Sequence, residues 1–223
     1  MSPGQIPLAL KPPRRPAFDN FIRGPNEALV ETLSGGLESG AWYLLGGPPG
    51  SGRTHLLSAV FADLQATGVS ASFVALSVPA NRPLLAETGG DWVVLDDIDA
   101  LAGDRDGEML LFNALNRWRD ERAGVIMGAT GRDAFDLPDL RSRLGQAVRL
   151  TIKPLDDSDL RRLVIRLAED QEVVLGRGAT DYLISRATRN PAGIARMTEQ
   201  LATRALTERR TLSIALIRET LNP

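Results

Sequence analysis

The chain has 223 residues, 26 basic against 28 acidic side chains, a formal net charge of −2 and no cysteine. This length allows one large domain, or a core with a small appendage. The absence of cysteine excludes disulfide scaffolds, thiolate zinc sites and cysteine nucleophiles, and the single histidine, His55, argues against a histidine-rich metal site or a histidine-based triad. The balanced charge is not that of a dedicated nucleic-acid binder, although it leaves room for a local basic patch.

The first sixteen residues contain five prolines and predict an extended tail. They lack the apolar core of a signal peptide, and their basic residues follow the apolar ones instead of preceding them. No apolar run in the sequence approaches the ~20 residues that span a bilayer. We therefore expect a soluble, cytoplasmic protein with a tail at 1–16 and a folded body that begins at residue 17.

Residues 17–153 alternate between short apolar runs and helical patterns. The apolar runs predict strands at 41–45, 72–76, 92–95, 125–127 and 147–150. The helical patterns predict helices at 25–33, 54–66 and 107–122. Four apolar residues share nearly one face of the last helix, namely Met109, Phe112, Leu115 and Trp118. The alternation predicts an α/β domain with a five-stranded parallel sheet, in which Trp42, Trp92 and Trp118 belong to the core.

The pattern changes after Pro154, where no strand is predicted. The remaining segments predict four helices, at 156–170, 180–188, 190–207 and 213–221. We therefore expect a second, all-α subdomain over residues 154–223.

A glycine-rich turn between the first predicted strand and the next helix carries the strongest motif. Its eight residues are Gly47, Pro48, Pro49, Gly50, Ser51, Gly52, Arg53 and Thr54. The spacing G-x-x-x-x-G-[K/R]-T in this context is that of a Walker A loop, whose backbone N–H groups and following helix start hold phosphates. The Thr54 hydroxyl is placed to bind Mg²⁺. The motif predicts a site for ADP or ATP with Mg²⁺.

The usual lysine of this motif is replaced by Arg53. A guanidinium can still bind phosphate oxygens, but its planar fork fills more of the space that a γ-phosphate needs than an ammonium group does. We therefore hypothesise that the site binds nucleotide, hydrolyses it poorly and prefers the diphosphate.

The third predicted strand ends in two carboxylates, Asp96 and Asp97, which is a Walker B pattern. Asp96 would hold Mg²⁺ through water, and Asp97 would polarise an attacking water. Thr130 follows the fourth strand at the sheet edge where ligands bind. It is either a sensor of the γ-phosphate or an ordinary loop threonine.

Three arginines elsewhere are candidates for phosphate contacts. Arg143, with Arg141 as the alternative, lies in the loop before the last strand and could reach a neighbouring subunit's nucleotide as a trans arginine finger. Arg196, near the start of a long helix, could reach back to the β- and γ-phosphates. Spacing alone leaves all three as possible surface arginines, and His55 is interpreted as a residue that packs at a helix start.

The tail holds a glutamine followed by spaced leucines, Gln5, Leu8 and Leu10. Apolar side chains could fill a pocket on a partner while the amide makes directional hydrogen bonds, so the segment is either a peptide anchor or an ordinary terminus.

Together these motifs resemble the AAA+ ATPase family and, within it, the DnaA/Hda branch. Residues 18–26 look like the F-D-x-F-x-x-G-x-N segment beside the adenine, which implies nucleotide contacts by Phe21 and Ile22. Residues 52–57 resemble the G-[K/R]-[S/T]-H-L-L of this branch, which adds His55 to the nucleotide-binding set.

The same resemblance implies roles for the arginines. The segment Leu137–Leu144 looks like the Box VII element that supplies the arginine finger, which maps onto Arg143. Gly193 to Arg196 matches the G-x-x-R of sensor 2, and the Asp96-Asp97 strand is similar to the I-D-D-I Walker B. The implied fold is a three-layer αβα AAA+ domain over 17–153, followed by a helical lid over 154–223.

The resemblance also implies partners. Gln5, Leu8 and Leu10 fit a Q-x-x-L-x-L motif that docks on the DNA polymerase III β sliding clamp. DnaA continues past its lid into a helix-turn-helix DNA-binding domain, whereas this sequence ends at Pro223, so contact with DNA is expected mainly through the clamp. The implied function is a homo-oligomeric or dimeric regulator of replication initiation that stimulates hydrolysis of the ATP on DnaA.

Three alternatives remain open on the sequence. The chain could be a helicase loader or a transposition-type AAA+ ATPase with its own turnover, or a nucleotide-binding adaptor that does not hydrolyse ATP. The near-neutral charge argues against the first, and Arg53 argues against the second.

Overall fold

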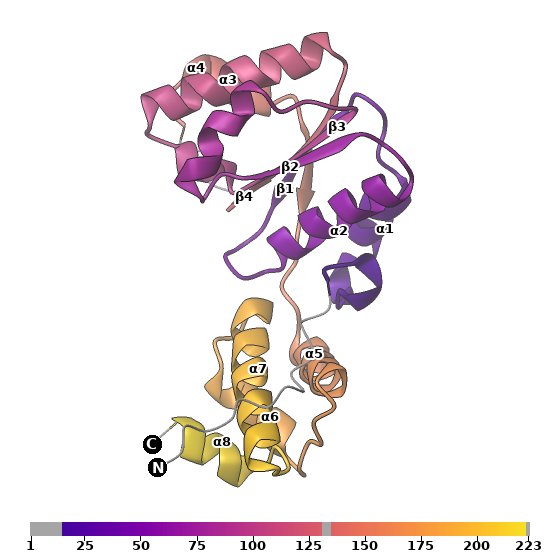
Figure 1. The fold of residues 1–223 in the computed structure, drawn as a ribbon, viewed down its shortest axis with the longest axis vertical. Helices are drawn as coiled ribbons and strands as arrows, with labels where there is room; N and C mark the ends of the chain where they lie inside the picture. The colour runs from indigo at the N-terminus through magenta and orange to yellow at the C-terminus, as the bar shows by residue number, and fades with distance from the viewer. Residues whose placement is uncertain (1–14, 131–134, 222–223) are drawn as a thin grey trace. The chain divides into compact units, whose positions relative to one another are not determined.

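The structure is a computed structural model, and it describes residues 15–130 and 135–221. It divides into two compact units, an α/β unit that covers Pro16–Lys153 and a helical unit that begins at Pro154 (Figure 1). No helix in these described ranges is long and apolar enough to cross a membrane.

Short apolar runs form one parallel sheet in the α/β unit. Its strands are β1 (Trp42–Gly46), β2 (Ala71–Ala75), β3 (Trp92–Asp96), β4 (Gly124–Ala129) and β5 (Val148–Thr151). Their order is β2-β3-β4-β1-β5, and every neighbouring pair is parallel. Because all strands run the same way, the loops after β1, β3 and β4 meet at one edge of the sheet.

Helices cover both faces of the sheet (Figure 1). The α-helices of this unit are α1 (Glu27–Gly35), α2 (Arg53–Ala66), α3 (Arg105–Asp120) and α4 (Pro138–Leu144). Short 3₁₀ helices add η1 (Phe18–Asn20), η2 (Gly24–Asn26), η3 (Pro79–Ala86) and η4 (Ile98–Leu101). Successive strand residues point to opposite faces. Accordingly Leu45 of β1 packs in one core with α1 and α2, and Leu44 packs in the other with α3 and α4.

The helical unit has its own apolar core. Its helices are α5 (Asp157–Asp170), α6 (Ala179–Arg186), α7 (Pro191–Glu208) and α8 (Ile214–Leu221). The Asn190 side chain caps α7 by accepting a hydrogen bond from the Gly193 N–H at 2.7 Å. A Cβ on Gly193 would lie 2.7 Å from the Thr188 carbonyl oxygen, so the tight start of α7 requires glycine there.

The predicted fold class is confirmed, and every predicted strand and helix lies within two residues of the observed one. The three tryptophans are buried, as expected. Two predictions are wrong. The segment before β5 is not a loop but contains helix α4, which starts at Pro138. Met109 does not share the buried face of α3, since it is 40% exposed. Residues spaced by three turn gradually around a helix that has 3.6 residues per turn. The buried face of α3 keeps Leu115 and Trp118 and includes Leu111 in place of Met109.

Candidate functional site

The predicted phosphate loop joins β1 to α2 at the carboxyl edge of the sheet. Gly50 and Gly52 have φ values of 77° and 101°, in the left-handed region that favours glycine. A Cβ on Gly52 would lie 2.9 Å from Cε2 of Phe21, and a Cβ on Gly47 would lie 2.7 Å from Oγ of Ser51. The backbone at Gly50 and Gly52 therefore favours glycine, and a side chain at Gly47 would displace the Ser51 hydroxyl.

The structure brings the two predicted magnesium ligands together. The Thr54 hydroxyl donates a hydrogen bond to Oδ2 of Asp96 at 2.6 Å, and the Asp97 N–H donates to Oδ1 of the same carboxylate at 3.0 Å. On the neighbouring strand, a Cβ on Gly128 would lie 2.9 Å from Oδ1 of Asp96. Gly128 thus makes room for the carboxylate at the base of the loop.

Asp96 is almost completely buried, and burial is the largest influence on its pKa. Burial raises the pKa of Asp96 above its ordinary value, and the neighbouring charge of Asp97 raises it further. The hydrogen bond from Thr54 and the charge of Arg53 offset only part of this effect. A cation at this carboxylate would remove the cost of burying its negative charge.

Arg53 links the loop to the end of β3. Its Nη2 donates to Oδ1 of Asp97 at 2.6 Å, and its Nη1 donates to the Gly47 carbonyl at 3.1 Å. The Arg53 side chain is buried, whereas Asp97 is about one-third exposed. Asp97 has a φ of 55°, a left-handed conformation that aspartate tolerates better than most residues. The Arg53 guanidinium is therefore hydrogen-bonded to Asp97, the carboxylate that we expect from the sequence to polarise an attacking water.

Two buried polar atoms of the loop fit a phosphate ligand. Within the described ranges, Oγ of Ser51 and Nε of Arg53 are buried and have no hydrogen-bond partner. Both can donate to phosphate oxygens, as can the remaining N–H groups of the guanidinium. The same ranges contain no cluster of three or more acidic, histidine or cysteine ligands for a metal. A magnesium ion here would rest on Thr54, Asp96 and the phosphates themselves, the manner in which Mg²⁺ binds in nucleotide sites.

The segment before α1 packs against the phosphate loop. The ring of Phe21 lies 5.6 Å from the ring of His55, centroid to centroid, and His55 Nε2 donates to the Ala17 carbonyl at 3.0 Å. Burial lowers the pKa of His55, despite the Ala17 hydrogen bond and the charge of Asp19. His55 therefore packs at the start of α2, and burial favours its neutral form. Ile22 is half-buried beside Phe21 in the chain.

Thr130 lies directly after β4, and β4 pairs Ala129 with Gly46 at the start of the loop. Its hydroxyl donates to Oδ2 of Asp99 at 2.6 Å, and its N–H donates to the same oxygen at 3.3 Å. Because this bond uses the hydroxyl hydrogen, Thr130 would have to turn away from Asp99 to donate to a phosphate oxygen.

The finger candidates lie on α4. Arg143 is half-buried, and Arg141 is exposed while its Nη1 donates to the Phe135 carbonyl at 2.8 Å. Arg196 is exposed on α7 of the helical unit. Its contact with nucleotide stays a prediction. Gln5, Leu8 and Leu10 lie outside the described residues.

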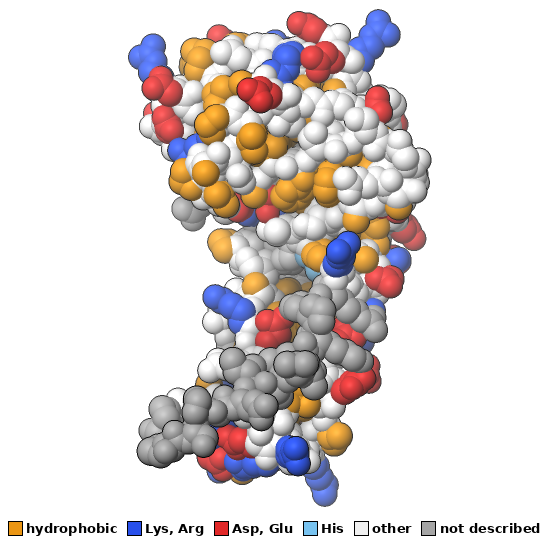
Figure 2. Space-filling model, viewed as in Figure 1, with side chains coloured by type: hydrophobic (Ala, Val, Ile, Leu, Met, Phe, Trp, Pro, Cys, Tyr) orange, Lys and Arg blue, Asp and Glu red, His pale blue; other side chains and the backbone are white. Residues whose placement is uncertain are grey.

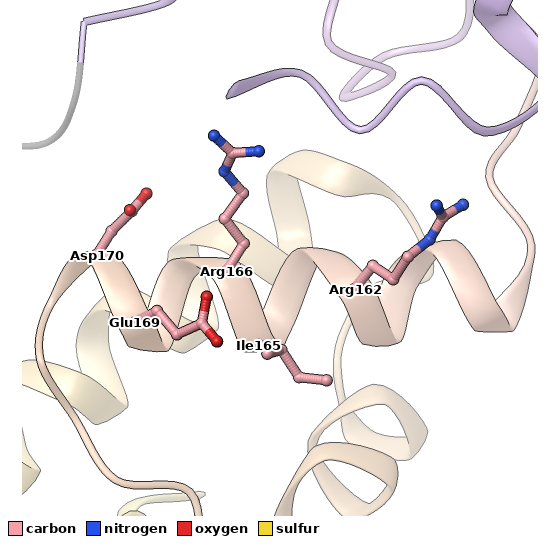
Figure 3. A pocket seen from close by; sticks show the side chains of 5 residues that line it. All are labelled: Arg162, Ile165, Arg166, Glu169 and Asp170. Atoms are coloured by element: carbon pink, nitrogen blue, oxygen red, sulfur yellow. The ribbon is translucent and has the colours of Figure 1, made fainter. Parts of the chain in front are cut away.

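Two shallow depressions lie away from these residues. One of about 370 Å³ lies along α5 and is lined by Arg162, Ile165, Arg166, Glu169 and Asp170 (Figure 3). The guanidinium groups of Arg162 and Arg166 point to the same side of the helix. The other, of about 540 Å³, lies at the amino edge of the sheet, where the Arg119 guanidinium lies 5.3 Å from the Trp42 ring. Both are open to solvent, and neither encloses a ligand.

Charges of both signs are interspersed on the face shown in Figure 2, with hydrophobic side chains between them. This agrees with the balanced composition and gives that face no single-sign field.

Sequence reasoning missed several residues that shape the site. Gly128 is signalled only as a glycine inside a strand, which indicates a close approach by another group. Asp99 and Glu108 are two further acids after the Walker B strand, and nothing in their spacing separates them from surface acids. Asn26 ends the segment that resembles the adenine-side motif, but its hydrogen bonds join residues far apart in the chain.

Comparison with known proteins supports this geometry. Residues 43–152 match the family model AAA, the ATPase family associated with various cellular activities. Domain III of the Thermotoga maritima replication initiation protein DnaA superposes with a TM-score of 0.73 at 17% identity, over 96% of this chain and 99% of that one. A point mutant of the Thermotoga maritima protein RuvB gives a TM-score of 0.70 at 22% identity, over 93% of this chain and 72% of that one.

A longer DnaA chain, bound to AMPPCP and single-stranded DNA, gives a TM-score of 0.68 at 20% identity, over 86% of this chain. The present chain spans 65% of that protein's length. At these identities the likenesses establish the fold: the α/β unit has an AAA+ fold similar to that of DnaA domain III and RuvB.

Proposed function

We propose that this chain is an Hda-like, cytoplasmic regulator of chromosomal replication initiation, which binds nucleotide itself and stimulates hydrolysis of the ATP held by DnaA. The observation that carries the proposal is the arrangement of the phosphate loop, in which Thr54 meets Asp96 while Arg53 bridges Gly47 and Asp97. This arrangement supports nucleotide binding and argues against fast turnover in the chain's own site.

Nucleotide binding uses the loop and its supports. The N–H groups of the loop and the start of α2 face the phosphates, and Ser51 and Arg53 add donors that are unpaired in the described structure. Thr54 and Asp96 would hold Mg²⁺, and the ion would screen the charge of the phosphate oxygens. Phe21 and His55 pack beside the loop and offer an apolar surface to the base.

Slow turnover follows from the Arg53–Asp97 pair. A carboxylate that polarises water must have a free oxygen aimed at that water. Asp97 instead accepts a charge-assisted hydrogen bond from Arg53 at 2.6 Å, so the guanidinium takes one of its two oxygens and fixes the carboxylate in place. In this proposal the chain binds ADP, and the bound ADP determines the conformation and oligomeric state of the chain. The chain's own site does not use ATP hydrolysis to drive a conformational cycle.

The catalytic contribution is made in the partner's site. An arginine supplied in trans stabilises charge on the transferring phosphoryl group and raises the rate by ~10³–10⁵. Arg143 on α4 is our candidate, with Arg141 as the alternative. Arg141 already donates to the Phe135 carbonyl, which supports Arg143 as the finger.

Recruitment to DNA uses the tail. We propose that Gln5, Leu8 and Leu10 bind the β sliding clamp, so that clamp loaded on DNA presents the protein to DnaA. Replacing Gln5 and Leu8 by alanine should abolish clamp binding in a pull-down or by surface plasmon resonance, while ADP affinity stays unchanged. Full clamp binding by this variant would refute the anchor.

The central experiment measures ATP hydrolysis by DnaA in the presence of DNA-loaded clamp and this protein. We expect acceleration that depends on clamp and is lost in Arg143→Ala, whereas Arg105→Ala, which removes an exposed arginine from α3, retains it. No acceleration by the wild type, or equal acceleration by Arg143→Ala and Arg141→Ala, would contradict the proposal.

The structural likeness to RuvB makes an ATPase with its own turnover the second candidate. Brisk hydrolysis of ATP by the isolated chain, with similar affinities for ADP and ATP, would favour it. A nucleotide-binding adaptor is a third possibility. It would retain its activity in Thr54→Ala, a variant that we expect to lose Mg²⁺-dependent nucleotide binding.

A further inference from the structure

Glu108 is a carboxylate in the core of the α/β unit. It lies in the first turn of α3 and is 1% exposed. Oε1 accepts hydrogen bonds from the N–H groups of Gly103 and Asp136, both at 2.9 Å, and Oε2 accepts one from the N–H of Leu137 at 2.7 Å. One side chain thus joins backbone segments that lie about thirty residues apart in the sequence.

The two distant donors fix where α4 begins. Asp136 and Leu137 directly precede Pro138, the first residue of α4, and Leu137 is its N-cap. The Leu137 side chain makes no capping hydrogen bond. Glu108 therefore binds the backbone entering α4, while Leu140 and Leu144 bury the helix against the core. Helix start and buried face together determine where Arg143 projects.

The carboxylate suits this role in its charged form. Burial opposes ionisation, but the three N–H donors, with Arg141 nearby, outweigh it and hold the pKa of Glu108 below its ordinary value. A charged acceptor makes stronger hydrogen bonds than a neutral amide oxygen. Glutamine at this position has one acceptor oxygen and brings an NH₂ group against backbone donors.

A second carboxylate, that of Asp99, binds the chain at Thr130, before residues 131–134, whereas Glu108 binds it after them. Asp99, in η4, accepts two hydrogen bonds from Thr130, and Glu108 accepts two from Asp136 and Leu137. Both acids follow Asp97 within the stretch 97–108. This stretch therefore fixes the chain on both sides of residues 131–134, between the nucleotide site and α4.

We infer that Glu108 is a positioning residue for the arginine finger, which holds the start of α4 so that Arg143 points out of the subunit in the orientation that a partner's nucleotide requires. The inference rests on the proposed function. Glu108 touches no substrate and acts only through α4.

The test compares Glu108→Gln with Asp106→Asn, a matched neutralisation of an exposed acid two residues earlier on α3. Stimulation of DnaA ATP hydrolysis should fall between about tenfold and 100-fold in Glu108→Gln, because misplacing a catalytic group by about 1 Å has effects of that size. Asp106→Asn should keep wild-type stimulation. ADP binding should be unchanged in both variants, which also verifies that each is folded.

A double-mutant cycle separates positioning from general destabilisation. The cycle is made on the Arg143→Lys background, which keeps a positive charge and therefore residual stimulation. If Glu108 acts through Arg143, Glu108→Gln should cost a smaller factor of stimulation on this background than on the wild type, because lysine lacks the planar fork whose orientation the start of α4 fixes. An equal factor on both backgrounds, or full stimulation by Glu108→Gln, would overturn the inference. Should Glu108→Gln lose ADP binding, the same cycle is made with Glu108→Asp, which keeps the charge and shortens the reach.

Hydrogen exchange gives a readout that does not depend on DnaA. The amides of Asp136 and Leu137 should exchange faster in Glu108→Gln, with no change for amides of β1. Unchanged exchange at these two amides would refute the positioning role even if the proposed function holds. Faster exchange in a protein whose wild type fails to stimulate DnaA would instead refute the proposed function and leave the Glu108 contact to α4 established.

Discussion

Among single residues, Asp96 carries the clearest conflict between stability and binding. Its carboxylate is buried, and its pKa lies above the ordinary value mainly because burial disfavours the charge. A carboxyl group whose pKa is raised on folding contributes most to stability when protonated, so that contribution is lost as the pH rises from about 3.8 through the raised folded-state pKa. At neutral pH the ligand-free protein therefore bears an electrostatic cost that a bound cation would relieve.

Replacing Asp96 by asparagine should stabilise the ligand-free protein at pH 7. Asparagine keeps an acceptor for the Asp97 N–H and a polar partner for Thr54, but it carries no charge. We expect an increase in melting temperature of about 2–4 °C, the shift that ~1 kcal/mol gives in a protein of this size. The same variant should lose Mg²⁺-dependent nucleotide binding. Both are measured by thermal unfolding with and without Mg²⁺ and ADP.

Asp63→Asn, which neutralises an exposed acid on α2, is the matched control and should leave the melting temperature and ADP binding unchanged. The gain of Asp96→Asn over wild type should shrink as the pH is lowered toward 4, because the wild-type carboxyl group becomes protonated. A variant that is less stable than wild type at pH 7 would contradict this account.

Arg53 is the residue at which the phosphate loop departs from the usual lysine. Its two hydrogen bonds reach Asp97 and the Gly47 carbonyl in different directions, and a single ammonium group cannot span both in the same way. In Arg53→Lys we therefore expect Asp97 to be released and the chain's own ATP hydrolysis to increase, measured as phosphate release at saturating ATP. In Arg53→Ala we expect ADP affinity to fall at least about tenfold, the loss of one charge-assisted contact.

Equal rates of ATP hydrolysis by the wild type and Arg53→Lys would show that the Arg53 guanidinium does not inhibit Asp97. Asp97→Asn is the internal check, since it should remove any activity gained in Arg53→Lys.

At the scale of elements, Asn26 fastens the entry segment to the end of β5. Its Nδ2 donates to the Lys153 carbonyl at 3.0 Å, and its Oδ1 accepts from the Lys153 N–H at 2.7 Å. Asn26 is 2% exposed, and the pair of bonds extends the sheet edge as another strand would. Ile152, the preceding residue, donates to the Gly46 carbonyl at 2.9 Å, so the end of β5 touches the start of the phosphate loop.

Asn26→Ala should lower the free energy of unfolding by about 1–3 kcal/mol, because two hydrogen bonds are lost and Lys153 keeps partial access to water. ADP affinity should also weaken, since η1 and η2 lose their attachment beside the loop. Urea unfolding and ADP titration measure the two effects. Asn113→Ala, on the exposed face of α3, is the matched control, and an effect as small as that of the control would rule out the proposed fastening.

The strands and long helices could be predicted because each follows a local pattern of period 2 or 3.6, and the phosphate loop could be predicted because its residues are consecutive. The start of α4 was missed because Leu137 has no capping side chain of its own and is held by Glu108 from another helix. The roles of Asp99 and Asn26 were missed for the same reason, since their partners lie 31 and 127 residues away. Contacts of this kind leave no spacing signal in one sequence.

For the whole molecule, the question is how nucleotide in the α/β unit affects the helical unit. Each unit has its own core, and the chain passes from one to the other between Lys153 and Pro154. Lys153 is held by Asn26, and Gly193 fixes the start of the helix that carries Arg196. If Arg196 contacts the phosphates, nucleotide binding would join two separately folded bodies.

Arg196→Ala should therefore change the stabilisation by bound nucleotide more than the stability of the ligand-free protein. Arg196 is exposed, so its removal should leave the melting temperature of the ligand-free protein within the small range of surface substitutions. The increase in melting temperature on adding saturating ADP or ATP with Mg²⁺ should be smaller than in wild type, because the bound nucleotide would contact only the α/β unit. Arg177→Ala, which removes another exposed arginine of the helical unit, should keep the wild-type increase. Equal nucleotide-dependent increases in Arg196→Ala and wild type would show that the helical unit senses nucleotide by another route, or not at all.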